Sequence, residues 1–360
     1  MRNFFIVIMA IGTVFSLAQW FMYRSVFSCL TPKWTILLFL IPIYVFSLIN
    51  GYMKILPLVM TRALAWAGGL YLAFFYYSII LLVLFLVVTL VGKLFAVPAL
   101  AQLFVKGALV VILLAIMLGC WNAAHHVYRE ETFTTKKPLA KPIKIAFFAD
   151  THLGVLFGND FSKGLVEKVN AVEPDLVLIG GDMVDNDLGF VLNEGSLKYW
   201  QNLKAPLGVY AVYGNHDVMR GTSGAEKEYL QSIGLHVVCN ETVNIGDNIV
   251  LTGLDDYSRS RNTYDFAPAP KDKVALFMEH QPRSLEKAAA KGYDLSFAGH
   301  THAGQFYPNR EITKRLYSLD YGSKFFEQML ATVTNGYGLW GVPVRVGPAP
   351  EIVVVTIKNE

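Results

Sequence analysis

Residues 143–152 read IKIAFFADTH, and the organisation of the chain follows from this stretch. Its first six residues are rich in Ile and Phe and predict a short buried β-strand. Asp150 and His152 follow the strand directly. Two residues apart at the end of an extended segment, their side chains can point to the same side. The stretch therefore predicts a strand that ends in a pair of potential metal ligands.

The same alternation of strand and helix continues to the end of the chain. Further strands are predicted at 176–179, 209–213, 249–252, 274–278, 295–298, 329–333 and 352–357, and helices at 161–171, 192–203, 225–233 and 284–291. Strands that alternate with amphipathic helices are typical of an α/β domain with buried sheets. We therefore expect one α/β domain over residues 143–360.

Residues with metal-binding side chains lie just past the carboxyl ends of the predicted strands. Open α/β sheets bind ligands at that edge, so segments far apart in sequence can converge there. The candidates are Asp150, His152, Asp182, Asp185, Asn215, His216, Asp217, His280, His300 and His302. Gly181 and Gly214 allow sharp turns that bring Asp182 and Asn215 close to a ligand.

The mixture of carboxylate, carboxamide and imidazole groups indicates which metals would bind. These ligands suit Mn, Fe or Zn, and no Cys lies among them, which argues against a structural zinc site. About seven ligands are too many for one tetrahedral ion, whereas two dications about 3.5 to 4 Å apart would use them all. Such a pair activates water and clamps a phosphoryl oxygen, so the set predicts metal-assisted hydrolysis at phosphorus.

Residues 1–128 have a different composition, with seven Lys or Arg and no Asp or Glu. A membrane-spanning helix needs about 20 apolar residues. Four stretches meet or approach that length, at 4–23, 34–53, 63–92 and 107–124. We expect a four-helix transmembrane domain over residues 1–125, a polar linker at 126–142 and the α/β domain at 143–360. A cleaved signal peptide is disfavoured because three further apolar runs follow the first.

The distribution of Lys and Arg predicts the orientation and limits the partners. With four spans, seven basic residues flank the spans on the side of the α/β domain and four on the other side, which favours a cytoplasmic α/β domain. No charged residue lies in the middle of a span, which argues against a transporter. The basic residues form no strong cluster, so we expect a lipid bilayer as partner and no nucleic acid.

Five blocks with metal-ligand chemistry occur in a fixed order along the chain. They are Asp150-Thr-His152, Gly181-Asp182-Met-Val-Asp185, Gly214-Asn215-His216-Asp217, a lone His280, and Gly299-His300-Thr-His302. In combination they resemble the calcineurin-like metallophosphoesterase superfamily. The resemblance implies a four-layer αββα sandwich, in which two central sheets are flanked by helices and metals bind at the sheet edge.

The resemblance also implies a role for each position. The first metal would be held by Asp150, His152 and His302, the second by Asn215, His280 and His300, and Asp182 would bridge them. His216 would protonate the leaving oxygen, with Asp185 as the carboxylate that keeps it cationic. Asp217 would support these ligands rather than bind metal. The expected cofactors are two divalent ions, Mn first, with Fe, Zn or Mg as alternatives.

The closing segment is similar to a membrane-associated bacterial branch of that superfamily, through Gln305 after the last block and residues 335–352. That branch includes phospholipid phosphodiesterases and a UDP-2,3-diacylglucosamine pyrophosphatase. We therefore expect a multi-pass protein of the bacterial inner membrane that cleaves a phosphodiester or pyrophosphate bond of an amphiphilic, lipid-linked substrate. Ala303 stands where Gly is usual in the branch.

The sequence also gives an alternative activity and candidate residues for substrate contacts. The alternative activity is that of a phosphomonoesterase or phosphoprotein phosphatase, although Asn186 stands where phosphoprotein phosphatases carry Arg. Arg side chains that could contact phosphate are Arg220, Arg259, Arg261, Arg310 and Arg345. Candidates for a lipid-facing rim are residues 155–157, Phe190, 325–326 and 339–340.

Overall fold

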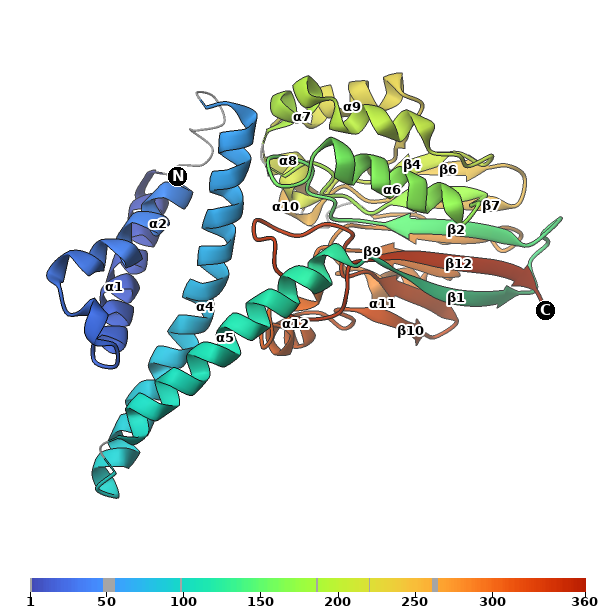
Figure 1. Ribbon diagram of the computed structural model, residues 1–360. Helices are drawn as coiled ribbons and strands as arrows, with labels where there is room; N and C mark the ends of the chain where they lie inside the picture. Colours follow the sequence, from blue (N-terminus) through green and yellow to red (C-terminus); the bar gives the residue numbers. More distant parts are fainter. Residues whose placement is uncertain (1, 48–55, 98, 186, 220, 261–264) are drawn as a thin grey trace. The chain divides into compact units, whose positions relative to one another are not determined.

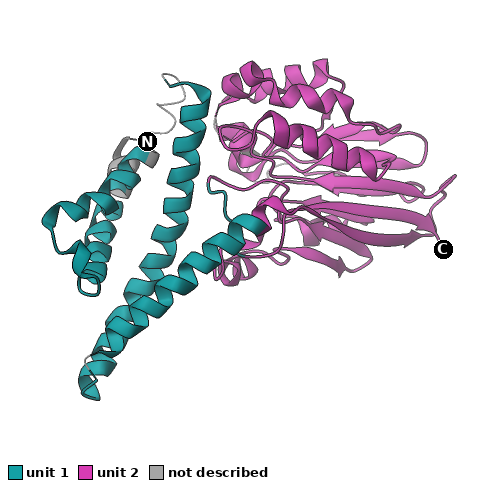
Figure 2. Cartoon of the chain, in the orientation of Figure 1, with its two compact units in different colours: residues 1–121, 342–346 teal, residues 122–341, 347–360 magenta. Residues whose placement is uncertain are grey.

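The computed structural model describes residues 2–47, 56–97, 99–185, 187–219, 221–260 and 265–360 (Figure 1). The chain divides into two compact units (Figure 2). Unit 1 comprises residues 1–121 and 342–346, and unit 2 comprises residues 122–341 and 347–360. The expected helical domain therefore also includes a short segment from near the carboxyl end of the chain.

Unit 1 is helical. Its α-helices are α1 (Arg2–Arg24), α2 (Leu37–Ser47), α4 (Leu58–Leu94) and α5 (Leu100–Ala124), with short 3-10 turns at Ser28–Leu30 and Lys33–Ile36. Apolar side chains from these helices form a buried cluster. Within the cluster, Trp20 Nε1 donates to Thr35 Oγ1 at 2.9 Å, and the hydroxyls of Tyr23 and Ser78 lie 2.9 Å apart. Buried polar groups in this unit therefore satisfy one another across helices.

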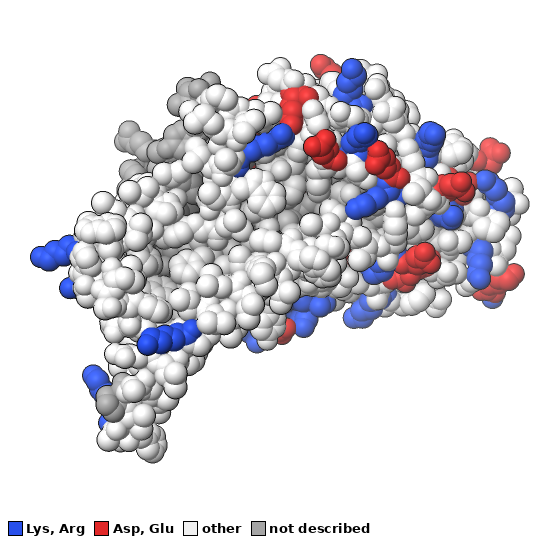
Figure 3. All heavy atoms as spheres, in the orientation of Figure 1, with Lys and Arg blue, Asp and Glu red and all other residues white. Residues whose placement is uncertain are grey.

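Two of the described helices, α4 and α5, are long and apolar enough to cross a membrane. They contain the predicted stretches 63–92 and 107–124. The predicted spans 4–23 and 34–53 are not among them: α2 has only 11 residues, and residues 48–53 lie outside the described part of the chain. The charged side chains on the visible face of unit 1 are few and basic (Figure 3). Two candidate spans are thus shown rather than four.

Unit 2 is built on two six-stranded sheets (Figure 1). In spatial order, the first sheet contains β1 (Val127–Thr135), β12 (Glu351–Asn359), β2 (Ile143–Phe148), β3 (Leu176–Ile179), β4 (Val209–Ala211) and β5 (His236–Val237). The second contains β10 (Gly322–Phe326), β11 (Met329–Val333), β9 (Leu295–Ala298), β8 (Val274–Met278), β7 (Ile249–Gly253) and β6 (Glu241–Ile245). The mixed α/β class predicted from the sequence is confirmed.

Unit 2 also contains helices, several of which pack on the outer faces of the two sheets. They are α6 (Asn159–Ala171), α7 (Leu188–Glu194), α8 (Asn215–Met219), α9 (Ser223–Ser232), α10 (Tyr257–Ser260), α11 (Leu285–Ala290) and α12 (Arg310–Leu316), with 3-10 turns at Ser196–Asn202 and His302–Gly304. The predicted helix at 192–203 is divided, because Gly195 adopts a left-handed φ of 86° and ends α7.

Side-chain alternation along the strands separates the layers of unit 2. In β2, Phe147 belongs to the core between the sheets, together with Leu276 of β8. Its neighbour Phe148 points to the opposite face and packs with Leu165 of α6. On the far side, Phe277 packs with Ala288 of α11. Because successive strand residues face opposite ways, these three apolar clusters correspond to a helix–sheet–sheet–helix sandwich.

The segment predicted as a linker, 126–142, contains strand β1. This strand pairs in parallel with β12 over nine residues. Its sequence, VYREETFTT, is mostly polar because it is an edge strand with one exposed face, so its hydropathy resembled that of a linker. An ion pair between Arg129 Nε and Glu351 Oε2, 3.1 Å apart, joins β1 to β12. The short strands β5, β6 and β10 were also missed, and each is brief or largely exposed.

Replacing Phe133 by Ala tests whether β1 is part of the domain core. Phe133 is buried between the sheets, so the variant should lower the free energy of unfolding of unit 2 by about 3 to 5 kcal/mol. Thermal unfolding followed by circular dichroism in detergent measures the change. Thr134→Ala, on the exposed face of the same strand, is the control and should change stability by less than about 0.5 kcal/mol. Equal stability of the two variants would contradict the assignment.

Candidate metal centre

The predicted ligands meet at one edge of unit 2. Strands β2, β3 and β4 run parallel in the first sheet, and β8 and β9 run parallel in the second. Their carboxyl ends therefore lie at the same edge of the sandwich. The loop after each strand supplies ligands, which are Asp150 and His152 after β2, Asp182 after β3, Asn215 and His216 after β4, His280 after β8, and His300 and His302 after β9.

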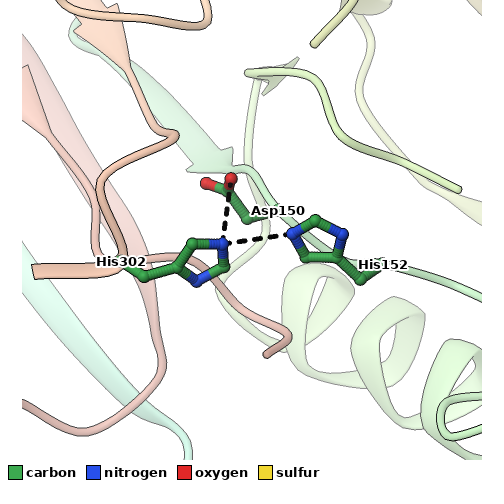
Figure 4. A group of neighbouring side chains, drawn as sticks. All are labelled: Asp150, His152 and His302. Carbon is green, nitrogen blue, oxygen red and sulfur yellow. Dashed lines mark hydrogen bonds and ion pairs between the residues drawn. The ribbon is translucent and has the colours of Figure 1, made fainter. Parts of the chain in front are cut away.

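One group of potential ligands consists of Asp150, His152 and His302 (Figure 4). His302 Nε2 lies 3.1 Å from His152 Nε2 and 3.5 Å from Asp150 Oδ1. One ligand atom from each of the three residues lies within 4.8 Å of the others. These are the residues that the motifs assign to the first metal.

A second group consists of Asp182, His280 and His300. His280 Nε2 lies 3.2 Å from Asp182 Oδ2 and 3.2 Å from Asn215 Oδ1. His152 Nε2 approaches the same Asp182 oxygen to 3.9 Å. One oxygen of the Asp182 carboxylate therefore lies within 4 Å of an imidazole from each group.

The protonation of His280 fits metal binding. Its Nδ1 lies 2.7 Å from the carbonyl oxygen of Gly180, and because a carbonyl only accepts, Nδ1 must carry the proton. When the ring is neutral, Nε2 then has a free lone pair beside Asp182 and Asn215. A metal-binding histidine commonly donates its other nitrogen to a backbone carbonyl in this way. The donor set as a whole, carboxylates, a carboxamide and imidazoles, fits two divalent ions.

The backbone is strained at the ligands. Asp150, His152, Asp182, His300 and His302 all have positive φ angles, between 45° and 72°. This left-handed region is uncommon for residues other than glycine and costs of order 1 kcal/mol or more per residue. Backbone hydrogen bonds between loops hold the conformation: Asp150 N donates to Gly181 O at 2.9 Å, and His152 N donates to Asp182 O at 3.1 Å.

Two glycines are required by close approach of the carboxylates. A Cβ on Gly214 would lie 2.1 Å from Asp182 Oδ1, and a Cβ on Gly299 would lie 2.4 Å from Asp150 Oδ2. Neither contact is compatible with the observed ligand positions. The space for the two carboxylates therefore depends on these two residues having no side chain.

Asp217 is buried and joins two of the ligand loops. Its carboxylate accepts hydrogen bonds from Gly214 N at 2.8 Å and from Met183 N at 3.1 Å. These amides lie next to Asn215 in one loop and Asp182 in the other. Asp217 thus supports the ligands, the role predicted for it.

The charges of the site shift its pKa values in opposite directions. Burial raises the pKa of Asp150 to about 6. Burial would also raise that of Asp182, but the charge and hydrogen bond of His280 hold the pKa of Asp182 well below its usual range. Burial, followed by the nearby charge of His280, lowers the pKa of His300 to about 3. The lowered pKa favours the neutral form of His300, which is the form that binds a metal. Burial lowers the pKa of His280, but the Asp182 carboxylate raises it well above its usual range, so a metal ion would have to displace the proton of this ring.

His216 lies beside both groups and shares its carboxylate partner with another imidazole. Its Nδ1 is 3.3 Å from Asp185 Oδ1, and the same carboxylate oxygen is 3.5 Å from His152 Nδ1. Asp185 thus lies between His216 and a residue of the first ligand group. His216 N donates to Asp182 Oδ1 at 2.8 Å, which fixes the start of α8 against the metal ligands.

A pocket of about 460 Å³ opens onto these residues. Its polar wall includes two residues of each candidate metal group, His152 and His302 of the first and Asp182 and His300 of the second. Its apolar wall includes Ile312 and Trp340, which are 58% and 59% exposed. The Trp340 ring lies edge-on to His216, with centroids 6.3 Å apart. Buried Gln305 holds the Trp340 backbone, because its Nε2 donates to Trp340 O at 3.2 Å and its Oε1 accepts from Trp340 N at 3.0 Å.

Among the residues that the structure describes, no other predicted rim residue lines this pocket. Val155 and Leu339 are buried, and Phe190 and Phe326 pack against the core clusters. Phe325 is exposed on β10. Of the rim candidates, Trp340 is thus the one that lines the pocket.

The arginines predicted to bind phosphate are occupied elsewhere or lie outside the described residues. Arg259 pairs with Asp255 at 2.5 Å and Arg310 with Asp320 at 3.3 Å. Arg345 is buried and belongs to unit 1. Arg220 and Arg261 are outside the described part of the chain. Sequence reasoning missed Arg283, which the structure places near His300, because no motif includes it.

Ala303 adopts the left-handed conformation that the usual glycine would favour, with a φ of 47°. Gly304 follows with a φ of 77°. The departure from the motif at this position therefore changes the residue without changing the turn.

The geometry defines a metal-dependent hydrolase site at the edge of an αββα sandwich, and comparisons with known proteins agree. Residues 143–304 match the family described as calcineurin-like phosphoesterase. An uncharacterized metallophosphoesterase of Aquifex aeolicus is 30% identical over 265 residues, which cover 69% of this chain and 98% of that protein. The chain belongs to the calcineurin-like metallophosphoesterase family, a family of metal-dependent phosphoric ester hydrolases.

Other relatives extend beyond the matched region. An uncharacterized metallophosphoesterase of Helicobacter pylori strain J99 is 33% identical over 234 residues, 62% of each chain, so this chain spans about three fifths of that relative. A zebrafish protein named transmembrane protein with metallophosphoesterase domain is 26% identical over 273 residues, 70% of this chain and 62% of that one. The match to a solved archaeal phosphodiesterase covers 54% of this chain and 85% of that chain at 21% identity, with a TM-score of 0.33.

Replacing Gly299 by Ala should disrupt metal binding without removing a ligand. The added methyl group would displace the Asp150 carboxylate, so we expect Mn²⁺ affinity to fall by about tenfold or more. Isothermal titration calorimetry and elemental analysis of the purified chain measure the loss. Gly164→Ala on α6, where nothing lies within 4 Å of the new Cβ, is the matched control and should bind Mn²⁺ normally. Normal binding by both variants would contradict the proposed position of Asp150.

Proposed function

We propose that this protein hydrolyses a phosphodiester or pyrophosphate bond with two divalent metal ions. The observation that carries the proposal is the convergence of two ligand groups on Asp182, whose Oδ2 lies 3.2 Å from His280 Nε2 and 3.9 Å from His152 Nε2. Asp150, His152 and His302 would hold one ion and Asn215, His280 and His300 the other, with Asp182 shared. Mn²⁺ suits this mixture of oxygen and nitrogen ligands, and Fe, Zn or Mg are the alternatives. Two such ions would supply an activated water and neutralise charge on the phosphoryl oxygens.

His216 is the candidate general acid. Its Nδ1 faces the carboxylate and the backbone carbonyl of Asp185, both of which only accept, so Nδ1 carries a proton. This leaves Nε2 to carry the second proton of the cationic ring and to donate it to the leaving oxygen. Asp185 stabilises that cation and orients the ring. His216 also lines the pocket, where a substrate would lie.

The His216→Ala variant should lower kcat for bis(p-nitrophenyl) phosphate by about 10² to 10⁴ while metal content stays unchanged. Asp182→Asn should lower both activity and metal content, because Asp182 lies between the two ligand groups. His236→Ala is the control, since His236 is exposed and stacks on Tyr210 away from the pocket residues. Full activity of the first two variants would refute the proposal.

We further propose that the enzyme is a multi-pass membrane protein with a cytoplasmic catalytic domain. Helices α4 and α5 are the best candidate spans, and α1 and α2 would lie in the membrane with them. The zebrafish and cattle relatives named transmembrane proteins support membrane association. The excess of Lys and Arg on the side of unit 2 supports the orientation, and the inner membrane of a bacterium is the expected location.

The proposed substrate is amphiphilic and lipid-linked. Trp340 and Ile312 expose apolar surface in the wall of a pocket whose other wall is polar. Trp340 lies on the side of His216, the candidate acid for the leaving group. An apolar or lipid-linked group next to the scissile bond would bury this surface, and membrane anchoring would place the enzyme near such substrates.

Replacing Trp340 by Ala should reduce the preference for acylated substrates. Loss of a contact of this size should lower kcat/KM for an acylated phosphodiester by about tenfold, with a smaller change for bis(p-nitrophenyl) phosphate. Phe325→Ala, which removes an equally exposed aromatic side chain on β10, is the control. Equal cleavage of soluble and acylated substrates by the unmodified enzyme would remove the support for a lipid-linked substrate.

The alternative activity is phosphomonoester or phosphoprotein hydrolysis at the same site. Metal ligands and general acid would be the same, so the metal centre does not separate the two activities. A competition assay between p-nitrophenyl phosphate and bis(p-nitrophenyl) phosphate does so, and preferential cleavage of the monoester would favour the alternative.

A further inference from the structure

Arg283 lies between two tyrosine rings beside the metal centre. Its guanidinium carbon is 4.5 Å from the centroid of the Tyr257 ring and 5.2 Å from that of Tyr317. One guanidinium nitrogen lies 3.4 Å from the Tyr317 hydroxyl. Aromatic faces attract a planar cation and restrict its orientation. The side chain is exposed, yet its charged end is held in place.

Within the described part of the chain, Arg283 forms no direct ion pair with a carboxylate. Among the residues that the structure describes, Arg129, Arg259 and Arg310 contact carboxylates, whereas Arg283 does not. Arg283 Nε instead donates to Gln281 Oε1 at 3.1 Å. The amide nitrogen of Gln281 donates to the buried Asp256 carboxylate at 3.0 and 3.1 Å, which turns the amide oxygen toward Arg283. The cation is thus oriented by neutral groups and keeps its capacity to bind an anion.

The Tyr317 ring connects this cation to the second group of metal ligands. The Tyr317 ring that contacts Arg283 is edge-on to the His300 ring, with centroids 6.0 Å apart. Arg283 also follows His280 by three residues in the same loop after β8.

We propose that Arg283 binds a second anionic group of the substrate, adjacent to the phosphorus that is attacked. This inference rests on the proposed hydrolysis at the metal centre and narrows its substrate class. A simple phosphodiester has one negative charge, which two metal ions would already neutralise. A pyrophosphate diester has a neighbouring phosphate, and a guanidinium fork pairs with phosphate through two parallel hydrogen bonds. Arg283 therefore favours a pyrophosphate-containing substrate over a simple phosphodiester.

Binding of one-phosphorus and two-phosphorus ligands tests this proposal. The full chain in detergent, loaded with Mn²⁺ at fixed free metal, is titrated calorimetrically with inorganic phosphate and with methylenediphosphonate, which is not hydrolysed. Arg283→Gln should weaken methylenediphosphonate binding by roughly ten- to hundredfold, as expected for loss of hydrogen bonds to a charged group. Phosphate binding should weaken by less than about fivefold, since a screened charge at a distance contributes little.

Two further variants distinguish the hydrogen bonds of the Arg283 guanidinium from its positive charge, and both from a general effect of replacing a stacked arginine. Arg283→Lys keeps the charge but loses the planar fork, so its affinity for methylenediphosphonate should lie between those of the native chain and Arg283→Gln. Arg259→Gln is the matched control, because Arg259 also stacks on a tyrosine, Tyr213, but already pairs with Asp255. It should bind both ligands as the native chain does.

Other outcomes contradict the inference in distinct ways. Equal weakening of both ligands by Arg283→Gln would place Arg283 at the attacked phosphorus or in the fold, and no weakening of either would remove it from the site. Either result overturns the proposal and leaves the metal-dependent hydrolysis intact. Failure of the native Mn²⁺-loaded chain to bind phosphate or to cleave bis(p-nitrophenyl) phosphate would instead contradict the proposed function itself.

Discussion

Two carboxylates, Asp150 and Asp182, are buried within reach of the same imidazoles, and the geometry of the site follows from how their charge is accommodated. A buried carboxylate is unfavourable unless it is paired or hydrogen-bonded. Asp150 receives the backbone amide of His300 at both oxygens, and Asp182 receives the amide of His216 and lies 3.2 Å from His280. Cations shared between the two carboxylates would complete this neutralisation, and the nitrogen ligands around them are suitably placed to hold such cations.

The surrounding fold holds these groups in conformations they would not adopt alone. Five ligand residues have positive φ, and Gly214 and Gly299 leave room that a methyl group would fill. Asp217 connects two of the loops, and the parallel strands fix where each loop begins. The strained ligand residues follow strands whose side chains are buried in two apolar clusters. The packing of these clusters offsets the unfavourable backbone conformations at the metal-binding edge.

Specificity would be set by residues outside the shared ligand set. Trp340 gives the pocket an apolar wall near His216, and Gln305 holds its backbone. Arg283 presents a cation on the side of His300, oriented by Tyr257 and Tyr317. A substrate with an apolar leaving group and two neighbouring anionic groups would use both features. The metal centre would perform the same hydrolysis on many esters, and these two side chains would select among them.

The strands that are buried on both faces, and the order of the ligands along the chain, could be predicted without coordinates. The bounds of β2, β3, β8, β9 and β11 agree with prediction, because short apolar runs bounded by polar or small residues give a strong local signal. The sequence predicts a linker where edge strand β1 lies, since a strand with one exposed face has few apolar residues. Three features emerged from the folded chain alone: the sharing of Asp185 by His152 and His216, the hold of Gln305 on Trp340, and the stacking of Arg283. These contacts join residues from different loops. The spacing of residues within one segment does not predict them, because the two sheets decide which loops come together.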